Sequence, residues 1–262
     1  MFNAYWRFDG YNSYSVNAER GTAFVDLIIR NGLAEGGSGQ TIRKYGNGIV
    51  KSTVNFNNLK NHFQVNGGTW YVDNPSEYGL GIQETTVAAG AKLGGTGYVG
   101  MKDDKGVNMI ALSNGSESNF ATLSPGTVDV ESGAHVYGTF TAGRSGQTKN
   151  KLALGNWAHL EIGVGPRDAA TRQPQADKLV VRGILQIGSN CTLDLVANSA
   201  DLKQIKSGTY TIVEADAVTG EFATVLKPRK SWKVTYETVG ESDAINRVTL
   251  TIPQPGTVVI VQ

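Results

Sequence analysis

The pattern that recurs most clearly along this chain is an aliphatic residue, a glycine three positions later, and then a short apolar run. It first appears at Val65–Val72, which reads Val-Asn-Gly-Gly-Thr-Trp-Tyr-Val. Further copies begin at Val87, Val130 and Val180. The glycines of the four copies are Gly68, Gly90, Gly133 and Gly183, separated by 22, 43 and 50 residues. These spacings fit one or two turns of a coiled chain with about 20 to 25 residues per turn, the lower end of solenoid repeat periods.

Glycine has a physical role in such a coil. Each short strand must turn a corner before the next strand, and glycine adopts the positive φ values that a residue with a Cβ resists. Successive turns then pair as parallel strands about 4.8 Å apart, so equivalent positions stack in columns. Apolar columns face inward, with Val65 and Val72 in the core, and Asn or Thr columns bond along the stack. The sequence therefore predicts an all-β protein, a right-handed parallel β-helix with a C-terminal β-hairpin cap.

The pattern divides the chain into four regions. Residues 1–40 mix aromatic residues with one apolar run and predict an N-terminal cap or irregular first turn, since an open end would expose unpaired strand edges. Its aromatic side chains either cap the core or stack on sugar rings. Residues 41–200 carry the regular turns. Residues 201–252 predict a capping segment that ends in a hairpin of two alternating runs, and residues 253–262 form a tail.

Two stretches resemble a known family. Ile42–Val50 reads Ile-Arg-Lys-Tyr-Gly-Asn-Gly-Ile-Val, and Gly90–Gly100 reads Gly-Ala-Lys-Leu-Gly-Gly-Thr-Gly-Tyr-Val-Gly. With the Val-Asn-Gly-Gly-Thr phrase, they resemble the passenger-associated repeat of bacterial autotransporters, the autotransporter-associated β-strand repeat. Ser207–Phe222 resembles the terminal portion of the same passenger domains. The resemblance covers residues 40–252, although Trp70 and Tyr71 stand where the repeat has smaller aliphatic residues.

The resemblance implies a secreted or surface-displayed stalk that mediates adhesion or self-association. It implies an extracellular or bacterial cell-surface location, with an outer-membrane anchor in a full-length precursor, so that membrane anchoring uses segments absent from this chain. The partners it implies are host or matrix glycans and proteins, or further copies of the chain. Two alternatives remain open from the residues: a structural subunit of an extracellular fibre or sheath, and a β-helical polysaccharide lyase or hydrolase.

Composition removes several other classes. A net charge of +1 and 18% charged residues give no electrostatic footprint for nucleic acid or an anionic membrane. The single cysteine, Cys191, excludes an intramolecular disulfide and is expected to be a buried, inert thiol. No stretch approaches the roughly 20 apolar residues of a membrane helix, and residues 1–10 lack the basic start and apolar core of a secretory signal.

One group of candidate residues comes from the repeat itself. Trp70, Lys92 and His135 each follow a repeated glycine by two positions, so stacking predicts that they share one exposed column. His159, in Ala-His-Leu, echoes Ala-His-Val at His135, which would place the two imidazoles on adjacent turns. A metal site needs further ligands at suitable spacing, and the sequence offers none. We therefore expect no metal and no cofactor.

A second group lies where the repeat is interrupted. These interruptions are Gly100–Val107, Gly143–Asn150 and Gly163–Asp177. The candidate residues among their charged side chains are Asp103, Asp104 and Lys105 in the first, and Arg167, Asp168 and Arg172 in the third. Catalysis would need carboxylates and a base within a few ångströms in a cleft, and no catalytic motif supports this. These residues are therefore weak binding candidates, no catalytic residue is assigned, and the prediction is a non-enzymatic protein.

Overall fold

The computed structural model describes residues 6–8, 14–30, 33–35, 41–53, 62–75, 84–100, 103–168, 170, 175–240 and 244–254. These residues form strands and turns, with no α-helix among them. None of the described segments is a helix with the length and apolarity needed to cross a membrane. The prediction of an all-β protein is confirmed.

Most strands belong to two long sheets. The nine-stranded sheet contains β3 (Leu27–Ile29), β6 (Ile49–Ser52), β8 (Gly68–Val72), β10 (Ala91–Gly95), β13 (Thr122–Pro125), β18 (His159–Gly165), β19 (Gln175–Ala176), β21 (Thr192–Val196) and β23 (Thr224–Leu226). The twelve-stranded sheet contains β2 (Tyr14–Asn17), β5 (Thr41–Tyr45), β7 (His62–Val65), β9 (Thr85–Val87), β11 (Tyr98–Val99), β12 (Asn108–Leu112), β16 (Thr139–Ala142), β17 (Lys151–Leu154), β20 (Lys178–Ile187), β22 (Gly208–Thr219), β24 (Lys233–Glu237) and β25 (Arg247–Ile252).

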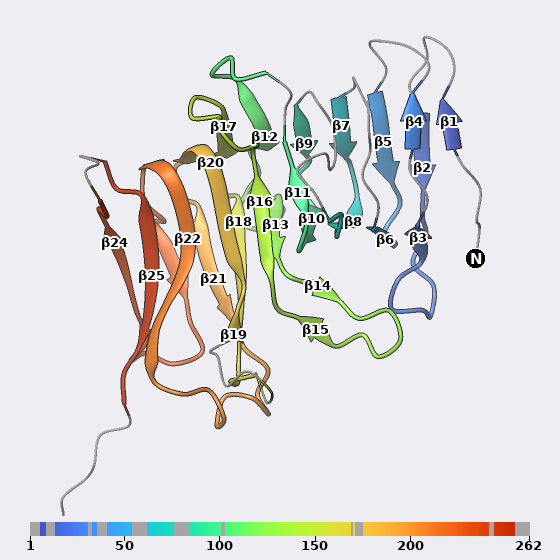
Figure 1. The fold of residues 1–262 in the computed structure, drawn as a ribbon. Helices are drawn as coiled ribbons and strands as arrows, with labels where there is room; N and C mark the ends of the chain where they lie inside the picture. The colour runs from blue at the N-terminus through green and yellow to red at the C-terminus, as the bar shows by residue number, and fades with distance from the viewer. Residues whose placement is uncertain are drawn as a thin grey trace, which may run out of the picture.

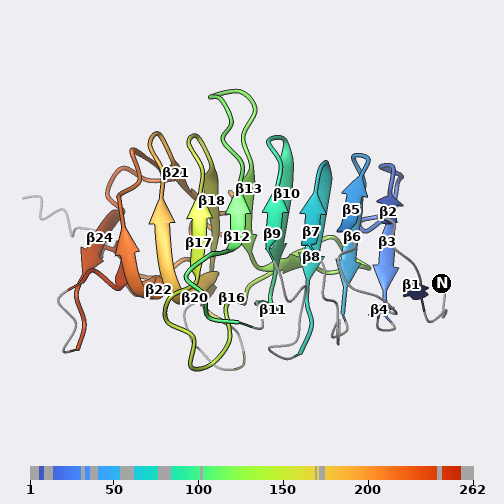
Figure 2. The same ribbon diagram turned by 90° about the horizontal axis from the view of Figure 1, so that it is seen from above.

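The chain passes back and forth between these two sheets. From β5 to β10, successive strands alternate between the twelve-stranded and the nine-stranded sheet, and the alternation resumes from β17 to β23 without β19. Up to β21, each strand on these paths pairs in parallel with the strand one turn later, for example β8 with β10 and β7 with β9. Figures 1 and 2 show the strands stacked side by side along one axis, from the blue N-terminal end to the red C-terminal end. These long parallel sheets are consistent with a solenoid-like fold.

Inward-facing apolar side chains stack into columns. In the nine-stranded sheet, register aligns Val50, Trp70, Leu93, Leu123, Leu160 and Leu193. All six are fully buried. The twelve-stranded sheet aligns Ile42, Phe63, Thr85, Ile110, Leu152 and Leu185 in the same way. Each large apolar side chain contributes about 1.5 to 3 kcal/mol by burial, so the alternation of apolar and polar residues determines which face is inside.

The four repeated glycines do not form one column. All four have positive φ, but Gly68 pairs with Ala91 instead of Gly90. Gly133 lies in the turn between β14 (Thr127–Val128) and β15 (His135–Val136), and Gly183 lies within β20. The alignment of the repeats on glycine is therefore wrong by one residue at the first pair, because Trp70 and Leu93 both point into the core and their packing determines the register.

An ammonium group occupies one inward position near the N-terminal end. Lys44 is fully buried in the column that continues through Val65 and Val87. Its Nζ donates hydrogen bonds to Gly46 O at 2.6 Å and Gly67 O at 2.7 Å. A Cβ at Gly68 would overlap this Nζ, so the first glycine of the repeat also makes room for the buried lysine. Burial lowers the pKa of Lys44 to about 8, although Glu19 and Asp26 oppose the shift.

Antiparallel pairs complete the structure. β24 and β25 pair antiparallel, as the predicted hairpin, and β25 also pairs with β22. The hairpin of β14 and β15 projects from the stack and reaches toward its N-terminal strands (Figure 1). Near the N-terminus, β1 (Trp6–Phe8) pairs with β4 (Leu33–Glu35) in parallel. Most of the predicted tail, residues 255–262, and much of region 1–40 lie outside the described residues.

Candidate ligand-binding face

The predicted exposed column of Trp70, Lys92, His135 and His159 is wrong. Trp70 is fully buried, its ring packs edge-on against Phe63 with centroids 4.7 Å apart, and its Nε1 donates to Ser52 Oγ at 3.0 Å. His135 lies on the projecting hairpin, whereas His159 begins β18, so the two histidines are not on adjacent turns of one column. Only Lys92 and His159 share an outward column, because the true register aligns Lys92 with Thr69 and not with Trp70.

Outward residues of the nine-stranded sheet form two polar columns. The first runs through Thr69, Lys92, Thr122, His159 and Thr192. The second contains Lys51 beside Tyr71, Gly94 beside Ser124, and Glu161 beside Asp194. Together with the β14–β15 hairpin we call this surface the polar face. The polar face gathers charged and hydrogen-bonding side chains on one side of the sheet. It is therefore the main candidate for a binding site.

Glu161 lies at the centre of the polar face. Both of its carboxylate oxygens accept hydrogen bonds from Lys92 Nζ at 2.9 Å, and Ser124 Oγ donates to Oε1 at 2.9 Å. Burial alone would raise the pKa of Glu161, but the Lys92 ammonium and these hydrogen bonds outweigh it and hold the pKa below its ordinary value. Glu161 is therefore an ionised, oriented carboxylate with about a third of its side chain exposed.

Its register partner Asp194 has the opposite environment. Burial, reinforced by the negative charge of Glu161, raises the pKa of Asp194, while His159 and Lys92 oppose the rise. His159 stacks flat on Phe120, with ring centroids 3.5 Å apart, and burial lowers its pKa. Two carboxylates with oppositely shifted pKa values thus lie on neighbouring strands beside a flat aromatic pair.

The β14–β15 hairpin is anchored to the polar face by a buried ion pair. Lys51 Nζ lies 2.7 Å from Asp73 Oδ2, and both side chains are about 90% buried. Lys51 Nζ also donates to Val128 O at 2.9 Å, and Thr127 Oγ1 donates to Asp73 Oδ2 at 2.8 Å. At the turn of the hairpin, Gly133 lies where a Cβ would overlap the ring of Phe24. These contacts hold the hairpin close against the N-terminal strands.

A second contact holds the base of the hairpin. The carboxylate of Asp177 is fully buried and lies 2.8 Å from His135 Nε2. It also accepts hydrogen bonds from the backbone N–H groups of Gly163 at 2.8 Å and Gly138 at 3.1 Å. Burial raises the pKa of Asp177, although the bonds from His135 and the two glycines oppose the rise. Asp177 ends the interruption Gly163–Asp177, and it is part of the packed structure instead of a projecting loop.

Between the hairpin and strands β18 and β21 lies a cleft of about 380 Å³, which we call the hairpin cleft. Its polar lining residues are His135, Tyr137, Glu161, Gln175, Asn198 and Asp201. Burial, with the charges of Asp201 and Asp177, raises the pKa of Tyr137 to about 12, so its phenol is a hydrogen-bond donor at neutral pH. Donors and acceptors therefore converge on a hollow of a size that suits one or two small ring units.

The candidate residues in the loop before β12 are structural. Asp104 accepts hydrogen bonds from the backbone N–H groups of Thr148, Lys149 and Asn150, each at 3.0 Å, and these bonds lower its pKa. Asp103 pairs with Lys105 at 2.9 Å on an open surface. The structure thus brings two predicted interruptions together, Gly100–Val107 and Gly143–Asn150. The Asp104 carboxylate joins them by accepting hydrogen bonds from backbone N–H groups, which is a structural role.

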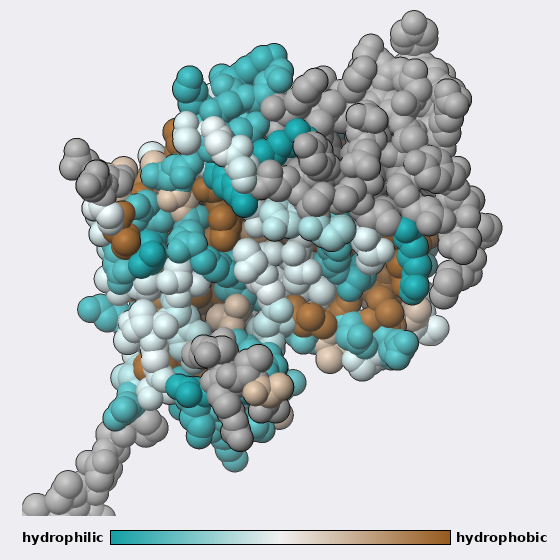
Figure 3. Space-filling view, in the orientation of Figure 1, coloured by the Kyte–Doolittle hydropathy of each residue, from teal (hydrophilic) through white to brown (hydrophobic). Residues whose placement is uncertain are grey.

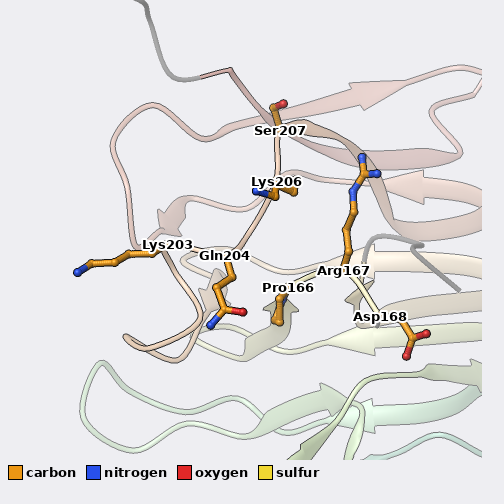
Figure 4. A pocket seen from close by; sticks show the side chains of 7 residues that line it. All are labelled: Pro166, Arg167, Asp168, Lys203, Gln204, Lys206 and Ser207. Carbon is orange, nitrogen blue, oxygen red and sulfur yellow. The ribbon is translucent and has the colours of Figure 1, made fainter. Parts of the chain in front are cut away.

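Asp168 follows β18, whereas Asp103 and Asp104 lie in the loop before β12. With Arg167 it lines a second pocket of about 690 Å³, next to Lys203 and Lys206 (Figure 4). Arg172, the third candidate in this interruption, lies outside the described residues. The carboxylates Asp103 and Asp104 do not line this pocket, so the structure does not join them with Asp168 in one site.

The sequence pattern did not single out Glu161, Asp194, Asp177 or Tyr137. The alternation in His-Leu-Glu-Ile at His159 does place Glu161 on the outward face. No local signal, however, pairs Glu161 with Lys92, which is 69 residues earlier. Within the described ranges, no group of three or more His, Cys, Asp or Glu side chains is arranged to hold a metal ion.

On the coloured surface in Figure 3, hydrophobic residues form small separate patches within a mostly hydrophilic surface. Cys191 is buried and unpaired, and burial raises the pKa of its thiol. A comparison with models of known protein families finds no match. A search of curated proteins finds no similar sequence.

Proposed function

We propose that this chain is a right-handed parallel β-helix of the autotransporter-passenger type that serves as a non-enzymatic, glycan-binding adhesion module. In this proposal it is secreted or displayed on a bacterial cell surface, and the glycan belongs to a host or matrix. The alternation of strands between two stacked parallel sheets supports the β-helix. The repeats at Ile42–Val50, Val65–Val72 and Gly90–Gly100 support the passenger assignment.

The observation that carries the binding function is the hairpin cleft. Sugars are recognised by hydrogen bonds to their hydroxyl groups and by contacts with flat ring surfaces. The cleft presents a phenol, two amides and carboxylates within about 380 Å³, and the Phe120–His159 stack lies on the same sheet face. The anchored hairpin pre-forms this arrangement, which reduces the entropy lost on binding.

A glycan array probed with the labelled chain tests the proposal. We expect a defined set of glycans to bind, and the double variant Tyr137→Phe/Glu161→Gln to weaken the dissociation constant about tenfold or more, because both hydrogen-bonding groups change. Glu131→Gln, in the exposed hairpin turn, is the matched control and retains binding. If no glycan binds and light scattering shows concentration-dependent assembly, the fibre-subunit alternative replaces this proposal.

One observation favours a second candidate, polysaccharide hydrolysis. Glu161 and Asp194 are register partners on parallel strands, so their backbones are about 4.8 Å apart, and their pKa values shift in opposite directions. In a hydrolase, the carboxyl with the raised pKa, Asp194, would protonate the glycosidic oxygen. At this spacing the ionised Glu161 would attack the anomeric carbon as the glycosidic bond breaks. Water, deprotonated by Asp194, would then cleave the bond between the sugar and Glu161, so that one molecule of water is consumed in all.

Release of reducing ends from a panel of polysaccharides separates the two candidates. Hydrolysis predicts new reducing ends with the wild-type chain, a loss of about 100-fold or more with either Asp194→Asn or Glu161→Gln, and full activity with Glu221→Gln, an exposed carboxylate elsewhere. Binding without any release of reducing ends rejects hydrolysis and leaves the adhesion module as the better assignment.

A further inference from the structure

A basic pocket lies beside the hairpin cleft. It is lined by Pro166, Arg167, Asp168, Lys203, Gln204, Lys206 and Ser207 and has a volume of about 690 Å³. Arg167 comes from the segment after β18, whereas the lysines come from the turn between β21 and β22. In the view of Figure 4, Arg167 extends toward the level of Ser207 and Lys206, Lys203 extends outward at the rim, and Asp168 points to the opposite side.

The positive charges of this pocket outnumber the negative ones. Among the described residues, Arg167, Lys203 and Lys206 make no ion pair. The carboxylate of Asp168, the one acidic group that lines the pocket, already accepts hydrogen bonds from Ala170 N at 3.0 Å and Gln175 Nε2 at 3.4 Å. Three cations and one carboxylate line the hollow, and such an excess of positive charge raises the local concentration of anions.

The turn that carries the two lysines is held in place. Arg229 Nη2 donates a hydrogen bond to Leu202 O at 2.7 Å, and Tyr210 OH donates to Lys206 O at 2.9 Å. The backbone N–H of Ile205 donates to Asp201 O at 3.0 Å. The backbone positions of Lys203 and Lys206 are therefore determined before any ligand arrives, which lowers the cost of binding.

The volume of the pocket exceeds what a simple ion needs and falls within the range of small-molecule sites. Gln204 and Ser207 add an amide and a hydroxyl that suit sugar hydroxyl groups. Pro166 lines both this pocket and the hairpin cleft, so the two hollows are neighbours. The cleft, in contrast, carries the carboxylates of Glu161 and Asp201, which repel a second anion.

We infer that the pocket of Arg167, Lys203 and Lys206 binds the carboxylate-bearing unit of an acidic glycan whose neighbouring unit is neutral and occupies the hairpin cleft. This inference rests on the proposed glycan-binding function and adds the substrate class. The guanidinium group of Arg167 pairs with the carboxylate through two parallel hydrogen bonds when the geometry allows, and Lys206 adds a point charge. The preferred ligand is a polysaccharide in which a uronic acid alternates with a neutral sugar.

Isothermal titration calorimetry of the full chain with three hexasaccharides tests the inference. The probes are a hyaluronan hexamer, in which uronic acid and N-acetylglucosamine alternate, a galacturonic acid hexamer, in which every unit is acidic, and a neutral chitin hexamer. We expect the hyaluronan hexamer to bind most tightly. The double variant Arg167→Gln/Lys206→Gln should weaken that binding about tenfold or more and leave the affinity for the neutral hexamer unchanged.

The matched control is Lys149→Gln, an exposed lysine in the loop before β17, which should bind the hyaluronan hexamer like the wild type. Thermal unfolding by circular dichroism checks that each variant is folded. The basic pocket has no such role if the double variant keeps full affinity for hyaluronan, or if the neutral hexamer binds as tightly as the hyaluronan hexamer. The proposed glycan-binding function would then stand without this inference. If the fully acidic hexamer binds best, the alternating-chain assignment is overturned. If no glycan binds on a broad array either, both proposals fail.

Discussion

The two faces of the nine-stranded sheet are built on different principles. On the inner face, the column from Val50 to Leu193 repeats one kind of side chain at each turn, and each member contacts its neighbours in the stack. On the outer face, the side chains change in kind from one turn to the next, and Lys92 bonds to Glu161, which is 69 residues away in the sequence. The inner face therefore repeats the same apolar packing at every turn, whereas the polar contacts of the outer face differ from turn to turn.

This difference determines where a mutation affects the stability of the fold and where it affects ligand binding. Buried apolar side chains gain free energy from the area they remove from water, and that gain is similar at every turn. Polar side chains on the outer face gain little wherever water can replace their partners. Substitutions at neighbouring positions of one strand should therefore have very different consequences.

Leu160 and Glu161 provide the sharpest form of the comparison, because they are consecutive residues of β18. Leu160 is fully buried, so Leu160→Ala should lower the free energy of unfolding by about 3 kcal/mol through lost burial and a residual cavity. Glu161→Ala should cost about 1 kcal/mol or less, because Lys92 is part-exposed and can be hydrated. Urea denaturation followed by tryptophan fluorescence measures both. Equal costs would contradict the division into two faces.

Replacing Asp177 tests whether buried polar contacts on the outer face also stabilise the fold. Its buried carboxylate accepts two backbone N–H groups and contacts His135. Asp177→Ala leaves those donors without an acceptor and should cost about 2 kcal/mol, less than Leu160→Ala but more than Glu161→Ala. Denaturation under the same conditions gives the ranking. Asp129→Ala, in the exposed hairpin turn, is the control and should have a smaller effect.

The inner face could be predicted from the sequence and the outer face could not. Alternation of apolar and polar residues identifies Leu93, Leu160 and Leu193 as inward residues without any knowledge of their partners. The register between strands is harder to predict. Aligning the repeats on glycine places Trp70 on the outer face, whereas its burial shows that side-chain packing sets the register. The column accommodates the large Trp70 side chain through Ser52 and Phe63.

The candidate site depends on long-range pairing that no local pattern encodes. Lys51 meets Val128, which is 77 residues away, and His135 meets Asp177, which is 42 residues away. The charged residues in the interruptions were visible in the sequence, but the pattern could not show that Asp104 would bind backbone N–H groups while Arg167 would line a pocket. Both roles depend on which loops become neighbours after the strands stack.

Lys44 is the exception to the apolar rule of the interior, and its pH dependence tests how well it is accommodated. Its pKa of about 8 lies below the ordinary lysine value of 10.5, so protonation favours the unfolded chain. Stability should therefore rise as the pH increases from about 8 toward 10, by a contribution on the order of 1 kcal/mol. Lys44→Met should remove this rise in denaturation experiments at pH 7.5 and 9.5. If the free energy of unfolding of the variant rises with pH as it does in the wild type, another group causes the rise.

The smallest effect should come from the ion pair between Lys105 and Asp103. Their side chains are 70% and 53% exposed, so water and salt screen the pair, and Lys105→Ala should change the free energy of unfolding by about 0.5 kcal/mol or less. The contrast with the Lys51–Asp73 pair is informative, since both of those side chains are about 90% buried. Removing Lys51 leaves a buried carboxylate without its cation, so Lys51→Met should cost more than Lys105→Ala in the same denaturation experiment. Equal costs would mean that burial does not set the strength of polar contacts on the outer face.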